Sequence, residues 1–201
     1  MARRGKNRDK LLDAGLDLLS HRGYSATGVQ EIADACGVPK GSFYNYFDSK
    51  EEFAIEVLRR YQEQACEHLR GVLGEAGRPP LERVRALFEG LSAEHAAAGF
   101  EGGCLAGRLT QELAGETPAF RKPLAWVFDC MQSSIAETLR EARDRGDLAA
   151  DADPAELAEF LLNAWQGAAM RAKAAHSRAP LDNFTRLAFG HLLPGARAAE
   201  A

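Results

Sequence analysis

Residues 27–50 read TGVQEIADACGVPKGSFYNYFDSK, and this stretch decides the fold of the N-terminal part of the chain. Its apolar residues recur every three or four positions, which is the spacing of two short helices. Gly37 lies between them and can adopt the left-handed conformation that ends a helix. Ala33 is small where two helices must cross closely, and Ile32 and Val38 would pack the pair onto a preceding helix. The stretch therefore predicts a helix-turn-helix.

The second helix of this motif follows Pro39 and is expected to run to about Phe47. Phe43 and Phe47 are four residues apart and are expected to face inward. The other side chains combine phosphate-binding with base-reading chemistry, and they are Lys40, Gly41, Ser42, Tyr44, Asn45 and Tyr46. Two tyrosines beside an asparagine exceed what a short core needs, which favours contact with the major groove of DNA. The alternative is that the rings only pack the small domain.

Apolar residues recur with helical spacing along almost the whole chain, and no segment alternates like a strand, so the predicted fold class is all-α. Caps, glycines and prolines divide the chain into nine helices. Their expected ranges are about 7–21, 28–36, 40–47, 50–73, 81–98, 104–114, 118–145, 154–177 and 181–193. The expected N-caps include Thr27, Asp48 or Ser49, Thr117 and Asp153.

Composition and charge fit a soluble protein with one basic end. Hydrophobic residues make up 46% of the 201 positions, and no apolar run approaches the roughly 20 residues that span a bilayer. The basic N-terminus lacks an apolar signal core, so a cytoplasmic location without membrane contact is expected. Residues 1–50 hold eight Lys/Arg against six Asp/Glu, whereas residues 51–201 hold seventeen against twenty-three. A basic head on an acidic body favours nucleic-acid binding at that end.

The four cysteines lie far apart and have neither the CxxC nor the Cys/His spacing of metal sites, so no metal or cofactor is predicted. They are expected to be reduced, and Cys36, Cys66 and Cys130 are interpreted as packing residues. Cys104 differs because it lies at a predicted helix N-terminus, where the helix dipole favours the thiolate. Arg108 lies one turn further on the same face and would add to that effect. An inert packing role for Cys104 remains the alternative.

The motif residues resemble those of the TetR family of transcriptional repressors. The shared pattern consists of Ile32-Ala33, Gly37-Val38, Tyr44 with Phe47, and Ser49-Lys50-Glu51, within a match over about residues 7 to 55. The resemblance implies nine or ten helices, a homodimer, binding to double-stranded operator DNA, and release of that DNA by a small-molecule inducer. It implies a helix-turn-helix domain at 1–50 and a ligand-sensing and dimerisation domain at 51–201.

The resemblance also implies roles for individual residues. Phosphate contacts would come from Thr27, Ser42, Tyr44, Tyr46 and Lys50, and base contacts would come from Lys40, Gly41 and Asn45. The basic arm of Arg3, Arg4, Lys6 and Arg8 would reach the minor groove or adjacent phosphates, or else is a solubilising tail.

The last two long helices carry apolar stripes with small residues at Ala164, Gly167 and Ala168. In the resembled family these helices pair with their symmetry mates in a four-helix dimer interface, although such a stripe also suits an intramolecular core. An inducer pocket needs apolar walls with a few polar groups. Candidate lining residues are Phe88, His95, Leu105, Trp126, Phe128, Met131, Trp165 and Met170.

Residues 102–114, GGCLAGRLTQELA, together with Trp165 and Lys173 resemble a TetR subgroup that represses electrophile-detoxifying genes, of the N-ethylmaleimide-responsive type. Some members sense electrophiles or oxidants through this cysteine and this lysine, which implies a sensor made of Cys104 and Lys173. Arg108 departs from the neutral residue of that pattern. The alternatives are a non-covalent hydrophobic inducer, an activator, an adaptor that binds protein through the acidic body, and a cysteine-dependent helical enzyme. For the enzyme, no motif supplies a general base.

Overall fold

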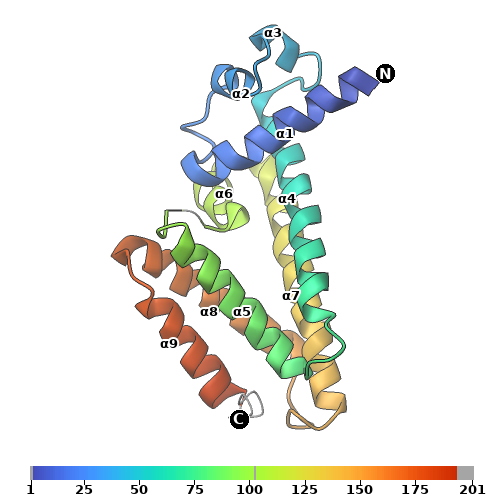
Figure 1. The fold of residues 1–201 in the computed structure, drawn as a ribbon, viewed down its shortest axis with the longest axis vertical. Coiled ribbons are helices and arrows are strands. Elements are labelled where there is room, and N and C mark those ends of the chain that lie inside the picture. Colours follow the sequence, from blue (N-terminus) through green and yellow to red (C-terminus); the bar gives the residue numbers. More distant parts are fainter. Residues whose placement is uncertain (1, 102, 194–201) are drawn as a thin grey trace. The chain divides into compact units, whose positions relative to one another are not determined.

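The computed structural model describes residues 2–101 and 103–193, with side chains from residue 7 onward. Every regular element in these ranges is helical, which confirms the all-α prediction. The nine α-helices are α1 (Ala2–Arg22), α2 (Val29–Ala35), α3 (Lys40–Phe43), α4 (Lys50–Leu73), α5 (Pro80–Ala97), α6 (Leu105–Leu113), α7 (Arg121–Asp144), α8 (Pro154–Ala175) and α9 (Ala179–Leu187) (Figure 1). A 3₁₀ turn at Pro118–Phe120 precedes α7, and a π turn at Ala188–Leu192 follows α9. Over the described ranges, no helix has both the length and the apolar character that a bilayer span requires.

Two long helices begin at the caps that the sequence predicts. The Asp153 carboxylate accepts hydrogen bonds from two backbone N–H groups in the first turn of α8, at 2.8 and 3.4 Å. The Ser49 Oγ accepts from the N–H of Glu52 at 3.0 Å at the start of α4. The Glu52 carboxylate reaches back to the N–H of Asp48 at 2.7 Å. These contacts satisfy donors that a helix leaves open in its first turn.

The prediction that Thr27 caps α2 is wrong. The Thr27 hydroxyl donates to the carbonyl oxygen of Gly23 at 2.7 Å, and the residue is fully buried. Gly28 occupies the N-cap position without a side-chain hydrogen bond. Thr27 therefore stabilises the loop between α1 and α2 through a buried hydrogen bond. Its hydroxyl is not available to cap the helix that follows.

α3 is a single turn, although the sequence predicts a helix that continues to Phe47. After Phe43 the backbone tightens, because the Tyr46 N–H donates to the Phe43 carbonyl at 3.0 Å, three residues back. The Phe43 and Phe47 rings then both pack on Phe53, with centroid distances of 5.1 and 4.9 Å. Packing of the three rings thus overrides the helical spacing of the sequence. Elsewhere α1 starts earlier than expected, at Ala2, and the 3₁₀ turn delays the start of α7.

The chain divides into two compact units. The first contains Met1–Gln64 and Cys104–Phe128, and the second contains Ala65–Gly103 and Asp129–Ala201. Helices α4 and α7 each continue from one unit into the other. This division does not follow the predicted functional boundary at residue 50, which stays a prediction.

The core of the first unit is built on Phe43, Phe47 and Phe53, each at most 1% exposed. Gly15 of α1 lies against Phe53 of α4, and a Cβ at this position would lie 2.3 Å from the ring's Cζ atom. Only glycine therefore lets the two helices approach this closely here. Leu11, Leu19 and Ile32 complete the buried surface beneath the helix-turn-helix.

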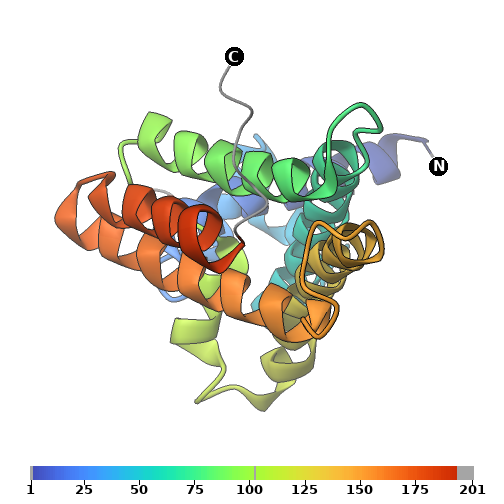
Figure 2. The ribbon, with the colours of Figure 1, turned by 90° about the horizontal axis from the view of Figure 1, so that it is seen from below.

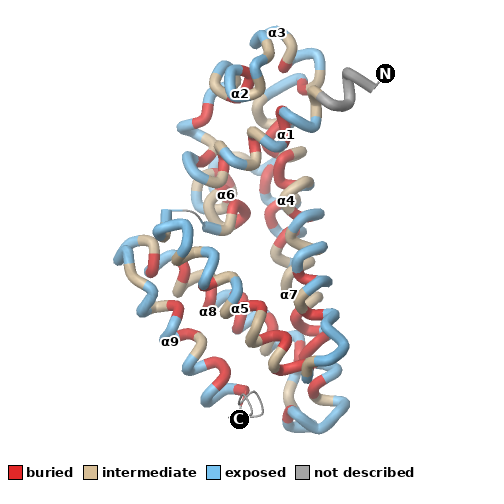
Figure 3. Tube along the Cα trace, in the orientation of Figure 1, coloured by how far each residue is buried: buried red, intermediate tan, exposed pale blue. Residues whose placement is uncertain are grey.

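The core of the second unit is centred on Phe88 of α5. Its ring lies 5.1 Å from that of Phe184 and 6.3 Å from that of Trp165. Figure 2 shows α8 and α9 side by side with α5 beside them. In Figure 3 buried and exposed residues alternate along α5 and α8 with the period of an amphipathic helix. Burial of aromatic rings from all three helices holds this unit together.

Arg83 of α5 joins three helices of the second unit through a buried guanidinium. Its side chain is 8% exposed. The guanidinium donates to the carbonyl oxygen of Leu73, in the last turn of α4, and to the carboxylate of Glu141 in α7. A cation at this position also interacts favourably with the C-terminal end of the helix dipole of α4.

Arg83→Ala should lower the free energy of unfolding by about 2 to 3 kcal/mol, because it leaves the buried Leu73 carbonyl without its donor. Glu141 is half exposed and can be hydrated, which limits the loss. Urea unfolding followed by circular dichroism measures the change. The matched control is Arg178→Ala, which removes an exposed pair with Asp182 and should cost less than about 0.5 kcal/mol. Equal losses in the two variants would contradict the assignment of Arg83 as a stabilising residue.

Candidate DNA-binding surface and sensor site

The turn between α2 and α3 has the geometry of a helix-turn-helix. Gly37 has φ +65°, a left-handed conformation that ends α2. The Val38 N–H then donates back to the Ala33 carbonyl at 3.0 Å. Ile32 and Ala33 are fully buried beneath the turn. These contacts fix α3 relative to α2 and leave the opposite side of α3 exposed.

The predicted reading residues gather on and just after α3. Lys40, Gly41, Tyr44 and Asn45 are exposed, and Ser42 and Tyr46 are partly exposed. Tyr44 is 51% exposed although its ring packs edge-on against buried Phe43, with centroids 5.3 Å apart. The tyrosine is thus anchored on one side and accessible on the other. An ammonium, hydroxyls and an amide on one surface supply the donors and acceptors that phosphates and base edges require.

Two residues predicted to bind phosphate have other partners. Thr27 is fully buried with its hydroxyl on Gly23, so a phosphate cannot reach it in this arrangement. The Lys50 Nζ lies 4.1 Å from the centroid of the Tyr24 ring, which is a cation–π contact. Burial lowers the pKa of Lys50, and the Glu112 carboxylate acts in the opposite direction. A phosphate would therefore have to draw Lys50 away from Tyr24.

The predicted basic arm is the first part of α1. The side chains of Arg3 and Arg4 lie outside the described residues. Arg8 bonds the Glu56 carboxylate at 2.8 Å and lies over the Phe47 ring at 5.4 Å from its centroid. Arg8 thus ties α1 to α4 and to the aromatic core, which differs from its predicted place in a free arm.

α6 is fastened to the end of α1 by two charged side chains. The Arg108 guanidinium donates to the carbonyl oxygens of Ser20 and His21 at 2.8 and 2.7 Å. The Glu112 carboxylate accepts from the backbone N–H of Ser25 at 3.0 Å. The sequence shows only that Arg108 and Glu112 are four residues apart, which puts them on one face of a helix. It does not indicate which residues they bind. The structure directs Arg108 to α1, whereas the sequence interpretation assigned it to the thiol.

Cys104 is the N-cap residue of α6 and is partly buried. The hydroxyl of Tyr61 on α4 donates to its sulfur, with an oxygen–sulfur distance of 3.3 Å. The Tyr61 hydroxyl and the first turn of α6 thus both direct positively polarised hydrogens toward the region of the sulfur. Tyr61 is a partner of the cysteine that sequence reasoning missed, because 43 residues separate the two in the chain.

Lys173, the predicted partner of Cys104, belongs to the second unit. Its ammonium donates to the carbonyl oxygen of Glu101 at 3.0 Å. Because Cys104 belongs to the first unit, the pairing of the two stays a prediction.

His95 lies near Lys173 in the second unit and packs edge-on against the Trp165 ring, with centroids 5.2 Å apart. Its buried Nδ1 has no hydrogen-bond partner among the described residues. Burial lowers the pKa of His95, Glu94 raises it and Lys173 lowers it, so the imidazole is favoured in its neutral form.

The other predicted sensor residues differ in burial. Trp165 is 3% exposed, and its indole N–H donates to the hydroxyl of buried Ser92 at 3.4 Å. Met131 packs at the edge of the same core. Trp126 is 55% exposed on α7 and lines a surface pocket with Leu58 and Pro123, so its place in an inducer pocket stays a prediction. Apolar character alone does not distinguish an interior ring from a surface one.

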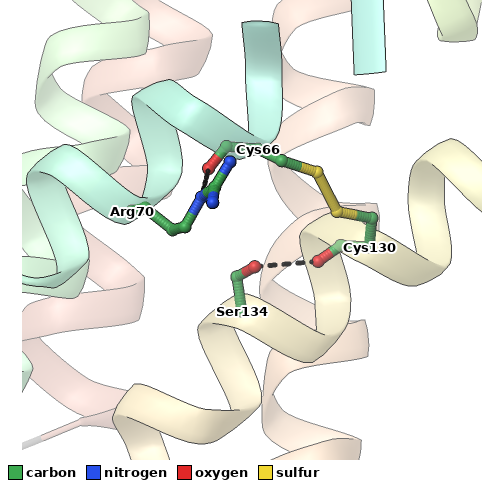
Figure 4. The surroundings of a disulfide bond; sticks show 4 residues. All are labelled: Cys66, Arg70, Cys130 and Ser134. Atoms are coloured by element: carbon green, nitrogen blue, oxygen red, sulfur yellow. Dashed lines mark hydrogen bonds between the residues drawn. A yellow bond between two sulfur atoms is a disulfide. The ribbon is translucent and has the colours of Figure 1, made fainter. Parts of the chain in front are cut away.

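The prediction that Cys66 and Cys130 are separate packing residues is also wrong. A disulfide joins them between α4 and α7 (Figure 4). The Cys36 sulfur donates to the carbonyl oxygen of Lys10 at 3.2 Å. Burial raises the pKa of the Cys36 thiol, Lys10 lowers it and Asp13 raises it.

Two protein families match the chain. Residues 11–57 match the family described as bacterial regulatory proteins, tetR family. Residues 80–188 match the family described as tetracyclin repressor-like, C-terminal domain.

Curated relatives match over most of the chain. The transcriptional regulator AcuR of Cereibacter sphaeroides is 41% identical over 177 residues, covering 88% of this chain and 80% of the relative. The HTH-type transcriptional repressor DhaR of Mycobacterium sp. strain GP1 is 35% identical over 191 residues, covering 93% and 92%. The HTH-type transcriptional repressor NemR of Escherichia coli K12 is 28% identical over 176 residues, covering 88% of each chain.

Solved structures have the same fold. The regulatory protein TetR from Rhodobacter sphaeroides has a TM-score of 0.84 at 38% identity, covering 90% of this chain and 95% of that one. The reduced form of Escherichia coli NemR has a TM-score of 0.82 at 26% identity, covering 92% and 96%. The chain belongs to the TetR family of DNA-binding transcriptional regulators, which are not enzymes.

Proposed function

We propose that this chain is a TetR-type repressor that binds a palindromic operator as a homodimer in the cytoplasm and is released by a small-molecule signal sensed at Cys104. The observation that carries the proposal is the fastening of α6, which begins at Cys104, to the end of α1. A change at the cysteine can thereby reach the helix-turn-helix. DhaR and NemR are named repressors, which supports repression in preference to activation.

The reading surface fits an operator contact. Tyr44 and Tyr46 offer hydroxyls to phosphates, and Lys40 offers a cation at the start of α3. Asn45 offers the amide that pairs with adenine in the major groove. Ser42 and Lys50 would add phosphate contacts, and Gly41 would let the backbone approach a base closely.

The dimer would form through the outer face of α8 and α9. Phe160 is 57% exposed there, and Leu187 and Leu192 are 44% and 40% exposed. They line a shallow apolar groove together with Ala164, Ala168, Pro180 and Phe184, and Arg171, Asn183 and His191 also line it. Large apolar side chains gathered on one surface of a soluble protein indicate an association site. A second copy supplies the same groove, and a two-fold dimer fits a palindromic operator.

The signal would act on Cys104 covalently. Its thiolate adds to the carbon–carbon double bond of an electrophile such as a maleimide, and the adjacent carbon takes up a proton. An oxidant converts the thiolate to a sulfenic acid, which an amine traps with loss of water, and the family resemblance assigns that amine to Lys173. Either product removes the hydrogen bond from Tyr61 on α4 and enlarges the N-cap of α6. The bonds from Arg108 and Glu112 would then carry the displacement to α1.

A non-covalent inducer is the second candidate. Trp165 and Met131 lie at the centre and edge of an apolar core, and His95 has a buried nitrogen without a partner among the described residues. Apolar walls with one polar group suit a small hydrophobic ligand.

Selection from random duplexes should enrich a palindrome, with affinity that falls steeply as salt rises. Tyr44→Phe removes one phosphate hydrogen bond and should weaken binding about fivefold to all sequences alike. Asn45→Ala should instead relax the preference at one base pair of each half-site by about 1 to 3 kcal/mol. Arg178→Ala, at the N-cap of α9, serves as the control and should leave affinity unchanged. Enrichment of no palindrome would rule out operator binding.

Phe160→Glu should convert the dimer into monomers, because it buries an unpaired carboxylate in the proposed interface. We expect the dimer dissociation constant to rise by at least about 100-fold in analytical ultracentrifugation. Trp126→Glu is a matched control, since Trp126 is a large apolar residue of nearly equal exposure on α7. Persistence of the Phe160→Glu dimer, or loss of the dimer in both variants, would show that the α8–α9 face is not the interface.

Cys104→Ser should abolish operator release by maleimides and by hypochlorite, because a hydroxyl does not undergo these reactions at neutral pH. Tyr61→Phe should slow release by removing the donor to the sulfur. Cys36→Ser, Cys66→Ser and Cys130→Ser are the controls and should release DNA as the parent does in a gel-shift assay. Full release of the Cys104→Ser protein would favour the non-covalent inducer.

A further inference from the structure

The disulfide between Cys66 and Cys130 joins α4 and α7 close to the points where the two helices enter the second unit. α4 enters the second unit after Gln64, and α7 enters it after Phe128. Each cysteine is the second residue beyond that point in its own helix. The chain passes between the units at three places, and the disulfide joins the two that are helical.

The backbone around both sulfurs is held by side chains one turn further along (Figure 4). The Arg70 guanidinium donates to the Cys66 carbonyl oxygen at 3.1 Å, and the Ser134 hydroxyl donates to the Cys130 carbonyl oxygen at 3.0 Å. The two Cα atoms are 7.0 Å apart. Both cysteines are partly exposed.

A disulfide in a DNA-binding regulator is subject to the redox conditions of the compartment that contains the DNA. Compartments that contain bacterial DNA keep thiols reduced, and disulfides found there are mostly transient or redox-sensing. A partly exposed disulfide in such a compartment is therefore open to both oxidation and reduction.

We propose that Cys66 and Cys130 form an oxidation site, which is a dithiol under reducing conditions and is converted to the disulfide by a peroxide. One thiolate attacks a peroxide oxygen and becomes a sulfenic acid as the oxygen–oxygen bond breaks, and the hydroxide that leaves takes up a proton. The second thiolate attacks the sulfenic acid sulfur and displaces its hydroxide, which also takes up a proton and leaves as water. Two electrons pass to the peroxide, and a small dithiol reverses the reaction by exchange.

The disulfide clamps α4 to α7 where both helices leave the second unit. It closes a loop across 64 residues of sequence, which restricts the unfolded chain and so stabilises the folded one. Oxidation thus holds the turns of α4 and α7 around Cys66 and Cys130 together. This proposal concerns cysteines other than Cys104 and does not depend on operator binding or on the inducer.

The chemical test uses the full chain with Cys104→Ser, so that only the other thiols can react. The reduced protein is treated with hydrogen peroxide, the remaining thiols are alkylated, and the peptides are mapped by mass spectrometry. We expect a linked peptide of Cys66 and Cys130 that dithiothreitol separates, with Cys36 still alkylated. Absence of the linked peptide, or pairing of either cysteine with Cys36 instead, would overturn the proposal.

The mechanical test compares hydrogen exchange in the oxidised and reduced forms of the same protein. Backbone amides at 62–70 and 126–134 should exchange at least about fivefold more slowly in the oxidised form, and the melting temperature should rise by about 5 °C or more. Cys66→Ser and Cys130→Ser, each treated with peroxide, should have neither effect. Equal exchange in the two forms would overturn the clamping role, and a failure of operator binding would not affect either test.

Discussion

The hydrogen bonds from α6 to the end of α1 are the constraint on which the regulator depends. Arg108 places a cation on the carbonyls that carry the partial negative charge of a helix C-terminus. Glu112 accepts from the backbone N–H of Ser25, in the loop that follows α1. Both side chains are about one quarter exposed, so each contact contributes on the order of 1 kcal/mol. Such contacts position the connection to α2, yet a signal of a few kcal/mol is enough to break them.

Because α6 is short, Cys104 lies close in the chain to Arg108, the residue that bonds α1. The helix has nine residues, and Arg108 lies about one turn from the N-cap at Cys104. A single short helix is stiff, so a displacement at its first turn is not absorbed before it reaches α1. Tyr61 adds a second contact at the same end, from α4 to the cysteine sulfur. α6 is therefore bonded to α4 through Cys104 and to α1 through Arg108.

Different kinds of interaction hold the helices together in the two units. In the second unit, Phe88, Trp165 and Phe184 hold α5, α8 and α9 by burial of aromatic surface, which has little directional preference and persists through small shifts. The first unit has an aromatic core as well, but its attachment to α6 is polar and directional, and such bonds are lost when an atom moves by about 1 Å. The second unit is thus held by apolar contacts, whereas the attachment of α6 to the helix-turn-helix side of the first unit depends on hydrogen bonds.

The sequence by itself determined the helical fold, the helix-turn-helix and most helix limits, because caps, glycines and periodic apolar residues act over a few neighbouring positions. It also placed Cys104 at the N-terminus of α6 and Tyr44 among the exposed residues of the motif. Only the tertiary structure decided that Thr27 is buried, that Arg108 binds α1, that Trp126 is exposed and that Cys66 pairs with Cys130. Each of these depends on which distant segments meet, and one local pattern is compatible with many such partners.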